Sequence, residues 1–140
     1  MSTRAILAGI AGAVFAFFLG WLIFGILLMD YYTANTTSYP GLMKEMPNLV
    51  LIFLSQLIMG LLFSFVFERW AGFRTIGRGI VGGIILGLPI MLSFDLFFLA
   101  GMNLFGPTLI VVDVLANAFV TALMGGLIGF ILGLKKKAAV

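Results

Sequence analysis

The stretch TLIVVDVLANAFVTALMGGLIGFILGL, which runs from Thr108 to Leu134, decides the fold. It is an apolar run whose single charged residue is Asp113. The run exceeds the roughly 20 helical residues that cross the hydrocarbon core of a bilayer. A helix is expected because backbone polar groups must be paired within lipid and because the two-residue alternation of a strand is absent. The stretch therefore predicts a transmembrane helix.

Three further apolar stretches have the same character. With the first they predict four spans, at 5–29, 48–67, 79–100 and 108–134. The chain of 140 residues is 63% hydrophobic and only 9% charged, whereas about 25% of the residues in a soluble domain are charged. The run at 5–29 is too long for the apolar region of a signal peptide, so an uncleaved anchor is expected. The sequence predicts an all-α integral membrane four-helix bundle that forms a single transmembrane domain over 1–140.

The positive charges predict how the spans are oriented. Four spans place all but one of the basic residues on the same face of the membrane: Arg4, Arg69, Arg74, Arg78, Lys135, Lys136 and Lys137. Lys44 alone falls on the other face. Because cytoplasmic loops carry the excess of Lys and Arg, both termini are predicted to be cytoplasmic, in a bacterial cytoplasmic (inner) membrane. The lysine tail is interpreted as a topology anchor, with contact to anionic lipid or to a partner as the alternative.

The composition argues against several classes of function. The chain has no histidine and no cysteine, which removes the commonest general base, the commonest metal ligands and thiol nucleophiles. No nucleophile elbow, zinc-protease motif or phosphate-binding loop is present. The net charge of +3 is explained by topology and does not indicate a nucleic-acid partner. We therefore expect no enzyme activity, no catalytic residue, no cofactor and no metal site.

The two halves of the chain contain a short internal repeat. RAILAGI at 4–10 matches RGIVGGI at 78–84, and IMGLLFSF at 58–65 matches LMGGLIGF at 123–130. Both pairs run in the same direction through the membrane. This pattern predicts a duplicated two-helix hairpin, with the halves related by an axis along the membrane normal.

Small residues recur at a spacing of four, which lets helix backbones approach closely inside a membrane. The glycines predicted to pack helices together are Gly12, Gly83, Gly87, Gly125 and Gly129. Most small residues lie in the predicted cytoplasmic half. One interpretation is a bundle that is tight at the cytoplasmic end and splayed at the outer end. The other is an evenly packed bundle whose glycine rows face a second copy.

Two aspartates flank the turn GMNLFGP at matching positions. Asp95 and Asp113 each lie about five residues inside a span, roughly 7–8 Å below the outer boundary at 1.5 Å per residue. Asn117 follows Asp113 at a spacing of four and shares its helical face. Gln56 and Trp21 reach a comparable depth on the other two spans. These five residues are the candidate ligand- or ion-binding residues.

Two interpretations of the aspartates remain open. An intramembrane carboxylate costs about 2.5–3.5 kcal/mol at a helix centre, so a pair could mark a water-filled outer pocket that binds a proton or cation. Alternatively, each carboxylate is hydrated near the headgroups, or the pair forms polar bonds across helices that contribute only about 0.6 kcal/mol each.

The arrangement resembles the small bacterial four-span membrane proteins that are classed only as a domain of unknown function. The likeness covers most of the chain and is carried by few residues: Gly20, Trp21, Met43, Lys44, Asp113, Gly125, Gly126 and Gly129. The resemblance implies an integral inner-membrane protein and implies no particular activity.

The leading hypothesis is a transporter-like or ligand-binding membrane protein with an outward-facing polar pocket. The alternative is a structural or accessory subunit that docks to a larger membrane protein through its glycine faces. The lipid bilayer is the expected surrounding. Either a homo-oligomer or a larger membrane-protein partner is expected, since four short spans enclose little volume.

Overall fold

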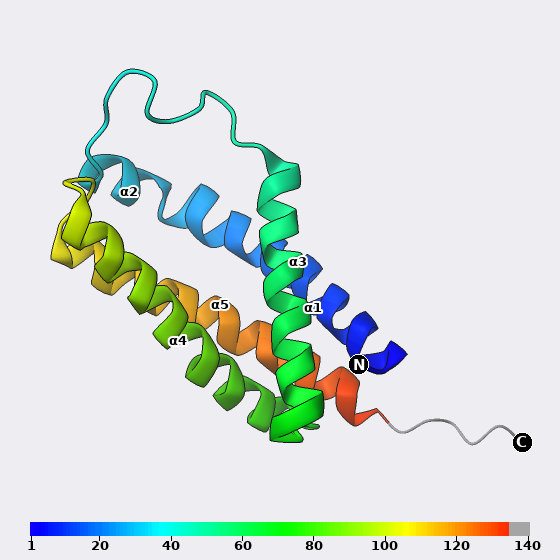
Figure 1. Ribbon diagram of the computed structural model, residues 1–140. Coiled ribbons are helices and arrows are strands. Elements are labelled where there is room, and N and C mark those ends of the chain that lie inside the picture. The colour runs from blue at the N-terminus through cyan, green and yellow to red at the C-terminus, as the bar shows by residue number, and fades with distance from the viewer. Residues whose placement is uncertain (135–140) are drawn as a thin grey trace, which may run out of the picture.

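The computed structural model describes residues 1–134, and it confirms an all-α fold with four helices long and apolar enough to cross a membrane. Figure 1 shows these helices as one bundle. The helices are α1 (Thr3–Leu22) with a π-helical extension η1 (Ile23–Leu27), α2 (Met29–Asn35), α3 (Leu49–Val66) with a π-helical extension η2 (Phe67–Ala71), α4 (Ile76–Gly101) and α5 (Pro107–Gly133). The protein is a multi-pass membrane protein by the length and composition of these helices. Lys135, Lys136 and Lys137 lie outside the described residues.

The four spans begin where the sequence supplies helix-starting residues. Ser2, Asn48 and Thr75 each accept a hydrogen bond from a backbone N–H in the first turn of α1, α3 and α4. Pro107 opens α5, at a position where its missing N–H costs nothing. Such capping explains why the predicted and observed ends differ by only a few residues. The short helix α2 is additional, since its residues were assigned to the outer loop.

Glycines of α4 and α5 bring these two helices into backbone contact. A Cβ built on Gly125 would lie 2.9 Å from the Cα of Gly83, and one built on Gly129 would lie 3.0 Å from the Cα of Gly79. A Cβ on Gly83 or Gly87 would collide with Thr121. The glycine rows therefore face each other inside one chain, and the interpretation in which they face a second copy is wrong for these two helices.

Helices α1 and α3 of the first hairpin cross at glycines that the internal repeat aligns with the glycines where α4 and α5 meet. Gly9 corresponds to Gly83 and Gly60 corresponds to Gly125 in the two sequence matches. A Cβ built on Gly9 would lie 3.0 Å from the carbonyl oxygen of Gly60, so α1 and α3 also meet glycine against glycine. One turn away, the Ser64 hydroxyl donates a 2.6 Å hydrogen bond to the carbonyl of Ala5. The equivalent crossings are the structural counterpart of the duplicated hairpin. Gly12 of α1 instead packs against Ile128 of α5, joining the halves.

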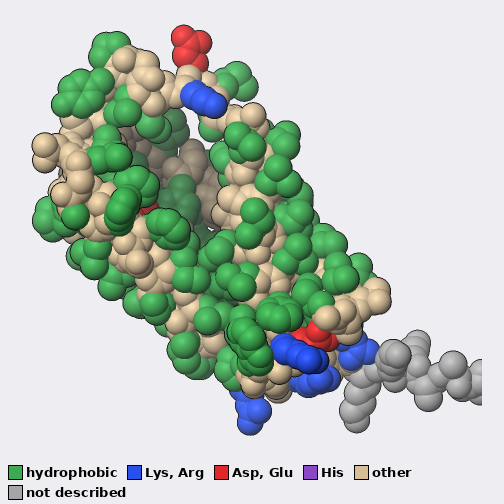
Figure 2. All heavy atoms as spheres, viewed as in Figure 1, with side chains coloured by type: hydrophobic (Ala, Val, Ile, Leu, Met, Phe, Trp, Pro, Cys, Tyr) green, Lys and Arg blue, Asp and Glu red, His purple; other side chains and the backbone are tan. Residues whose placement is uncertain are grey.

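The bundle is tight at one end and open at the other. At the tight end Glu68 accepts hydrogen bonds from the backbone N–H and hydroxyl of Ser2, and Arg4 donates to the carbonyl of Leu134. Basic side chains gather at this end of the molecule (Figure 2). At the other end α3 diverges from α4 and α5, and the loop 36–48 crosses the gap (Figure 1). The structure therefore has the splayed arrangement.

Candidate functional site

A cavity of about 430 Å³ lies at the splayed end of the bundle. Figure 2 shows the molecule hollowed on this side, away from the basic end. The wall combines two carboxylates, five hydroxyl-bearing residues and six apolar residues: Tyr32, Thr33, Thr36, Thr37, Ser38, Leu42, Met43, Asp95, Leu104, Phe105, Leu109, Ile110 and Asp113. The residues come from α2, the following loop, α4, the α4–α5 turn and α5, so the cavity forms only when the chain is folded.

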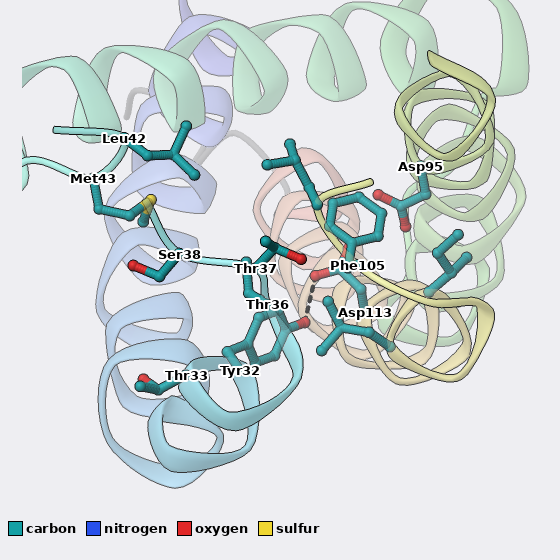
Figure 3. Close-up of a pocket in the computed structure, with 13 residues that line it drawn as sticks. Tyr32, Thr33, Thr36, Thr37, Ser38, Leu42, Met43, Asp95, Phe105 and Asp113 are labelled. Atoms are coloured by element: carbon teal, nitrogen blue, oxygen red, sulfur yellow. Dashed lines mark hydrogen bonds between the residues drawn. The ribbon is translucent and has the colours of Figure 1, made fainter. Parts of the chain in front are cut away.

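A break in the first span places Tyr32 in this wall. The π-helical segment η1 ends at Leu27, and the backbone of the next residue, Leu28, leaves the helical region at φ −105° and ψ 1°. The chain then restarts as α2, and the ring of Tyr32 packs edge-to-face on Phe24 with centroids 5.8 Å apart. Figure 3 shows the Tyr32 hydroxyl pointing at Asp113 of α5. Wide π-helical turns often occur at functional sites, where they redirect a side chain.

The protein itself supplies hydrogen-bond donors to both carboxylate oxygens of Asp113. Tyr32 donates to Oδ1, and the amide of Asn117 donates to Oδ2 at 2.8 Å and to the Asp113 carbonyl at 3.0 Å. The hydroxyl of Thr121 donates to the carbonyl of Asn117 at 3.0 Å, which continues the polar line one turn deeper. Asp113 is therefore held in place by the folded chain.

Asp95 lines the same cavity, but the fold does not hold it by hydrogen bonds in the way that it holds Asp113. It lies six residues before the end of α4, as Asp113 lies six residues after the start of α5, so the two carboxylates are at equal depth. Its Oδ2 is buried and has no hydrogen-bond partner among the described residues. A buried polar atom without a partner is costly, and more so when it is charged. Asp95 thus lines the cavity, and the described residues supply no hydrogen-bond donor to its buried oxygen.

Tyr32 is kept in its neutral, hydrogen-donating form. Burial raises the pKa of its phenol above the ordinary value of 10.0, and the hydrogen bond to Asp113 and the nearby negative charges raise it further. The neutral phenol can donate to Asp113, whereas a phenolate would repel it. The pair Tyr32–Asp113 is therefore stable as a donor and an acceptor at neutral pH.

The loop after α2 closes the cavity against the α4–α5 turn. The backbone N–H of Thr37 donates to the carbonyl of Leu104 at 2.6 Å, and its hydroxyl donates to the carbonyl of Asn103 at 2.8 Å. Thr36 forms an isolated antiparallel bridge with Phe105. These bonds fix the first residues of the loop. Leu42 and Met43, further along the same loop, also line the cavity (Figure 3).

The structure brings three of the five predicted site residues together. Asp95 and Asp113 line the cavity, and Asn117 supports Asp113 from below. Gln56 is half-buried on the same face of α3 as Gly60. It does not line the cavity, because α3 has diverged from α4 and α5 at the depth of Gln56.

Trp21, the fifth predicted site residue, is not among the residues that line the cavity. The inward line of the first span runs through Gly12 and Ala16 to Ile23, and each helical residue turns the chain by about 100°. Trp21 is therefore rotated away from the bundle, beside Phe18, and both side chains are 60% exposed. This position suits contact with lipid.

Sequence reasoning missed Tyr32 and the loop residues that complete the wall. Tyr32 lies with Tyr31 and Tyr39 between the first two predicted spans, where the sequence predicts no site residue. One feature of the sequence indicates that Tyr32 faces inward: it lies four residues after Leu28, so it continues an apolar helical face beyond the end of the first span. The hydroxyl-bearing residues of the loop carried no local signal.

Within residues 1–134, no group of three or more acidic ligands lies close enough together to hold a metal ion. Comparison with protein-family models, with curated proteins and with solved structures finds no significant match. What the site does must therefore be argued from its own chemistry, since fold alone does not determine function.

Proposed function

We propose that this protein binds a small solute in the cavity at the splayed end of the bundle, as a ligand-binding or transporter-like membrane protein. The observation that carries the proposal is the unpartnered carboxylate oxygen of Asp95 in a cavity of about 430 Å³. Ligand pockets of proteins usually span about 300–1,000 Å³ and combine apolar walls with a few fixed polar groups. The cavity has that size and that character.

The two carboxylates have separate roles in this proposal. Asp113, anchored by Tyr32 and Asn117, is the fixed negative charge of the site. Asp95 supplies a second carboxylate in the cavity wall, to which a ligand can bind. Ionisable residues that face a cavity inside the membrane usually mark substrate or ion pathways, because their burial is too costly to be kept without use.

We further propose that the cavity opens to the outer side of a bacterial cytoplasmic membrane. Arg4, Arg69, Arg74 and Arg78 lie at the opposite end, and positive charges favour the cytoplasmic side. Both termini would then be cytoplasmic. A small solute would reach Asp95 from outside, past the loop 36–48.

Cysteine labelling tests the cavity, because the native chain contains no cysteine. Leu109 and Val120 form a matched pair on α5, since they are 4% and 5% exposed but only Leu109 lines the cavity. We expect Leu109→Cys to react with a membrane-impermeant maleimide applied from outside intact cells. Val120→Cys should stay unreactive, and Lys44→Cys in the outer loop should react at once.

Failure of Leu109→Cys to react, with Lys44→Cys reacting normally, would mean that the cavity is dry and would overturn the proposal. The accessory-subunit alternative would then be preferred. That alternative needs a docking surface other than Gly83 and Gly125, because both glycines are buried between α4 and α5.

A further inference from the structure

We infer that the solute bound in this cavity is an organic cation, an ammonium group carried on a compact apolar body. The inference rests on the proposed function and names the ligand class for the same site. The charge of the ligand is inferred from the ionisable residues of the wall, and its shape is inferred from the apolar residues.

The charge follows from the ionisable residues that face the cavity. Asp95 and Asp113 are both negative when ionised, and no lysine or arginine appears among the lining residues that the structure describes. Two carboxylates in one low-dielectric cavity repel each other, and a cation between them relieves that repulsion. An anion would meet two like charges. A neutral solute would leave both charges uncompensated.

The hydrogen-bonding pattern favours a cation that can donate. Asp113 already accepts from Tyr32 and Asn117, whereas Oδ2 of Asp95 accepts from no described residue. An ammonium N–H can donate to the carboxylate of Asp95 where it lines the cavity, which gives a charge-assisted hydrogen bond. The aromatic faces of Tyr32 and Phe105 in the same wall are further favourable neighbours for a cation.

The apolar part of the wall sets the shape of the ligand. Leu42, Met43, Leu104, Leu109 and Ile110 surround the carboxylates with hydrocarbon and a thioether. Burying apolar surface against them contributes roughly 25 cal/mol per Å². Methionine is unbranched and adapts to ligands of varied outline. A ligand that combines one positive charge with an apolar body uses both parts of the wall.

A bare inorganic ion fits the same cavity poorly. Calcium takes six to eight oxygen ligands and magnesium demands near-ideal octahedral geometry, whereas this wall supplies two carboxylates and scattered hydroxyl groups. A volume of about 430 Å³ would also leave most of the apolar wall in contact with water. Size and lining together favour an organic cation.

The test measures protection of Leu109→Cys against the maleimide by probes of similar size and three different charges. The probes are 2-phenylethylammonium, the neutral 2-phenylethanol and the anionic 3-phenylpropanoate. We expect the ammonium to slow labelling at concentrations at which the other two do not. One charge-assisted hydrogen bond corresponds to a difference in affinity on the order of 10- to 100-fold.

Asp95→Asn supplies the variant test, and Asp30→Asn is its matched control. Asp30 is an exposed acidic residue of α2 that does not line the cavity. The first variant should lose protection by the ammonium, and the second should keep it. The comparison of the three probes on native Asp95 does not depend on how well either variant folds.

The outcomes separate this inference from the proposed function. Absence of labelling at Leu109→Cys overturns the cavity itself. Rapid labelling that the three probes slow equally, or do not slow, leaves the cavity standing and overturns the cationic ligand. Protection by sodium or calcium chloride at concentrations at which the ammonium is ineffective would likewise overturn it, in favour of an inorganic ion.

Discussion

The hydroxyl of Tyr32 donates a hydrogen bond to the carboxylate of Asp113, a residue 81 positions further along the chain. This bond joins α2, which follows the first span, to the N-terminal half of α5. It also leaves Asp95, at the same depth on α4, as the carboxylate with an unpartnered oxygen. The cavity therefore has one carboxylate that the fold bonds at both oxygens and one whose buried oxygen has no described donor.

Removing the Tyr32 hydroxyl should destabilise the splayed end of the bundle. Tyr32→Phe leaves one oxygen of Asp113 without its donor, and a hydrogen bond to a charged group contributes about 1.5–3 kcal/mol. We expect a loss of that order in the free energy of unfolding, measured by denaturant titration in mixed micelles. Tyr39→Phe is the control, since Tyr39 is 63% exposed. Equal stability of the two variants would show that the bond contributes little.

The ionisation of Tyr32 should be delayed in alkaline solution. Its pKa is raised above 10.0 in the folded protein, so the unfolded chain loses this proton first as the pH rises. The stability that the neutral phenol contributes is therefore present below pH 10.0 and is lost above it. The tyrosinate absorbance of the native protein minus that of Tyr32→Phe should show no ionisation near pH 10.0. An ordinary titration in that difference would mean that the phenol is solvated.

Backbone contact between α4 and α5 should make Gly83 intolerant of a methyl group. Gly83→Ala would push a Cβ into the backbone of Thr121, and overpacking of this kind typically costs about 1–3 kcal/mol. Gly77→Ala is the matched control on α4, because a Cβ there meets nothing within 4 Å. The control should be neutral or slightly stabilising, since alanine favours helix by up to about 1 kcal/mol. Thermal unfolding of both variants measures the difference.

The hydrogen bond from Ser64 to Ala5 should matter less than the glycine contacts around it. Polar bonds between membrane helices average about 0.6 kcal/mol, so Ser64→Ala should lower the free energy of unfolding by about that amount. Gly60→Ala, one turn away, should cost more, because its Cβ would lie 3.1 Å from the backbone nitrogen of Ala13. A larger loss for Ser64→Ala than for Gly60→Ala would contradict this ranking.

The fold was predictable because its causes are local. Long apolar runs require helices in lipid, and glycines at a spacing of four mark the faces that meet. The same periodicity correctly placed Asn117 beside Asp113, four residues apart on one helix. It would also have excluded Trp21, had its angle from the inward line of α1 been considered together with its depth.

The rest of the site depends on contacts between distant segments. Tyr32 reaches Asp113 because the helix breaks at Leu28 and restarts, and the local sequence does not specify the angle of that restart. Thr37 is positioned by the carbonyls of Asn103 and Leu104 in a distant turn. No periodic pattern encodes such bonds, so the cavity became visible only in the folded chain.

The most direct test compares the stability of Asp95→Asn with that of Asp113→Asn, each measured without ligand. Asp113→Asn keeps one acceptor oxygen and places an amide NH2 group against either Tyr32 or Asn117, both of which need an acceptor, so the free energy of unfolding should fall by about 1–3 kcal/mol. Asp95→Asn removes a charge that has no described partner, so stability should rise, by no more than the roughly 2.5–3.5 kcal/mol cost of a carboxylate at a helix centre. Opposite signs would support one structural carboxylate and one available to a ligand. A comparable loss in both variants would show that Asp95 is also bonded by the fold, and would contradict the central claim.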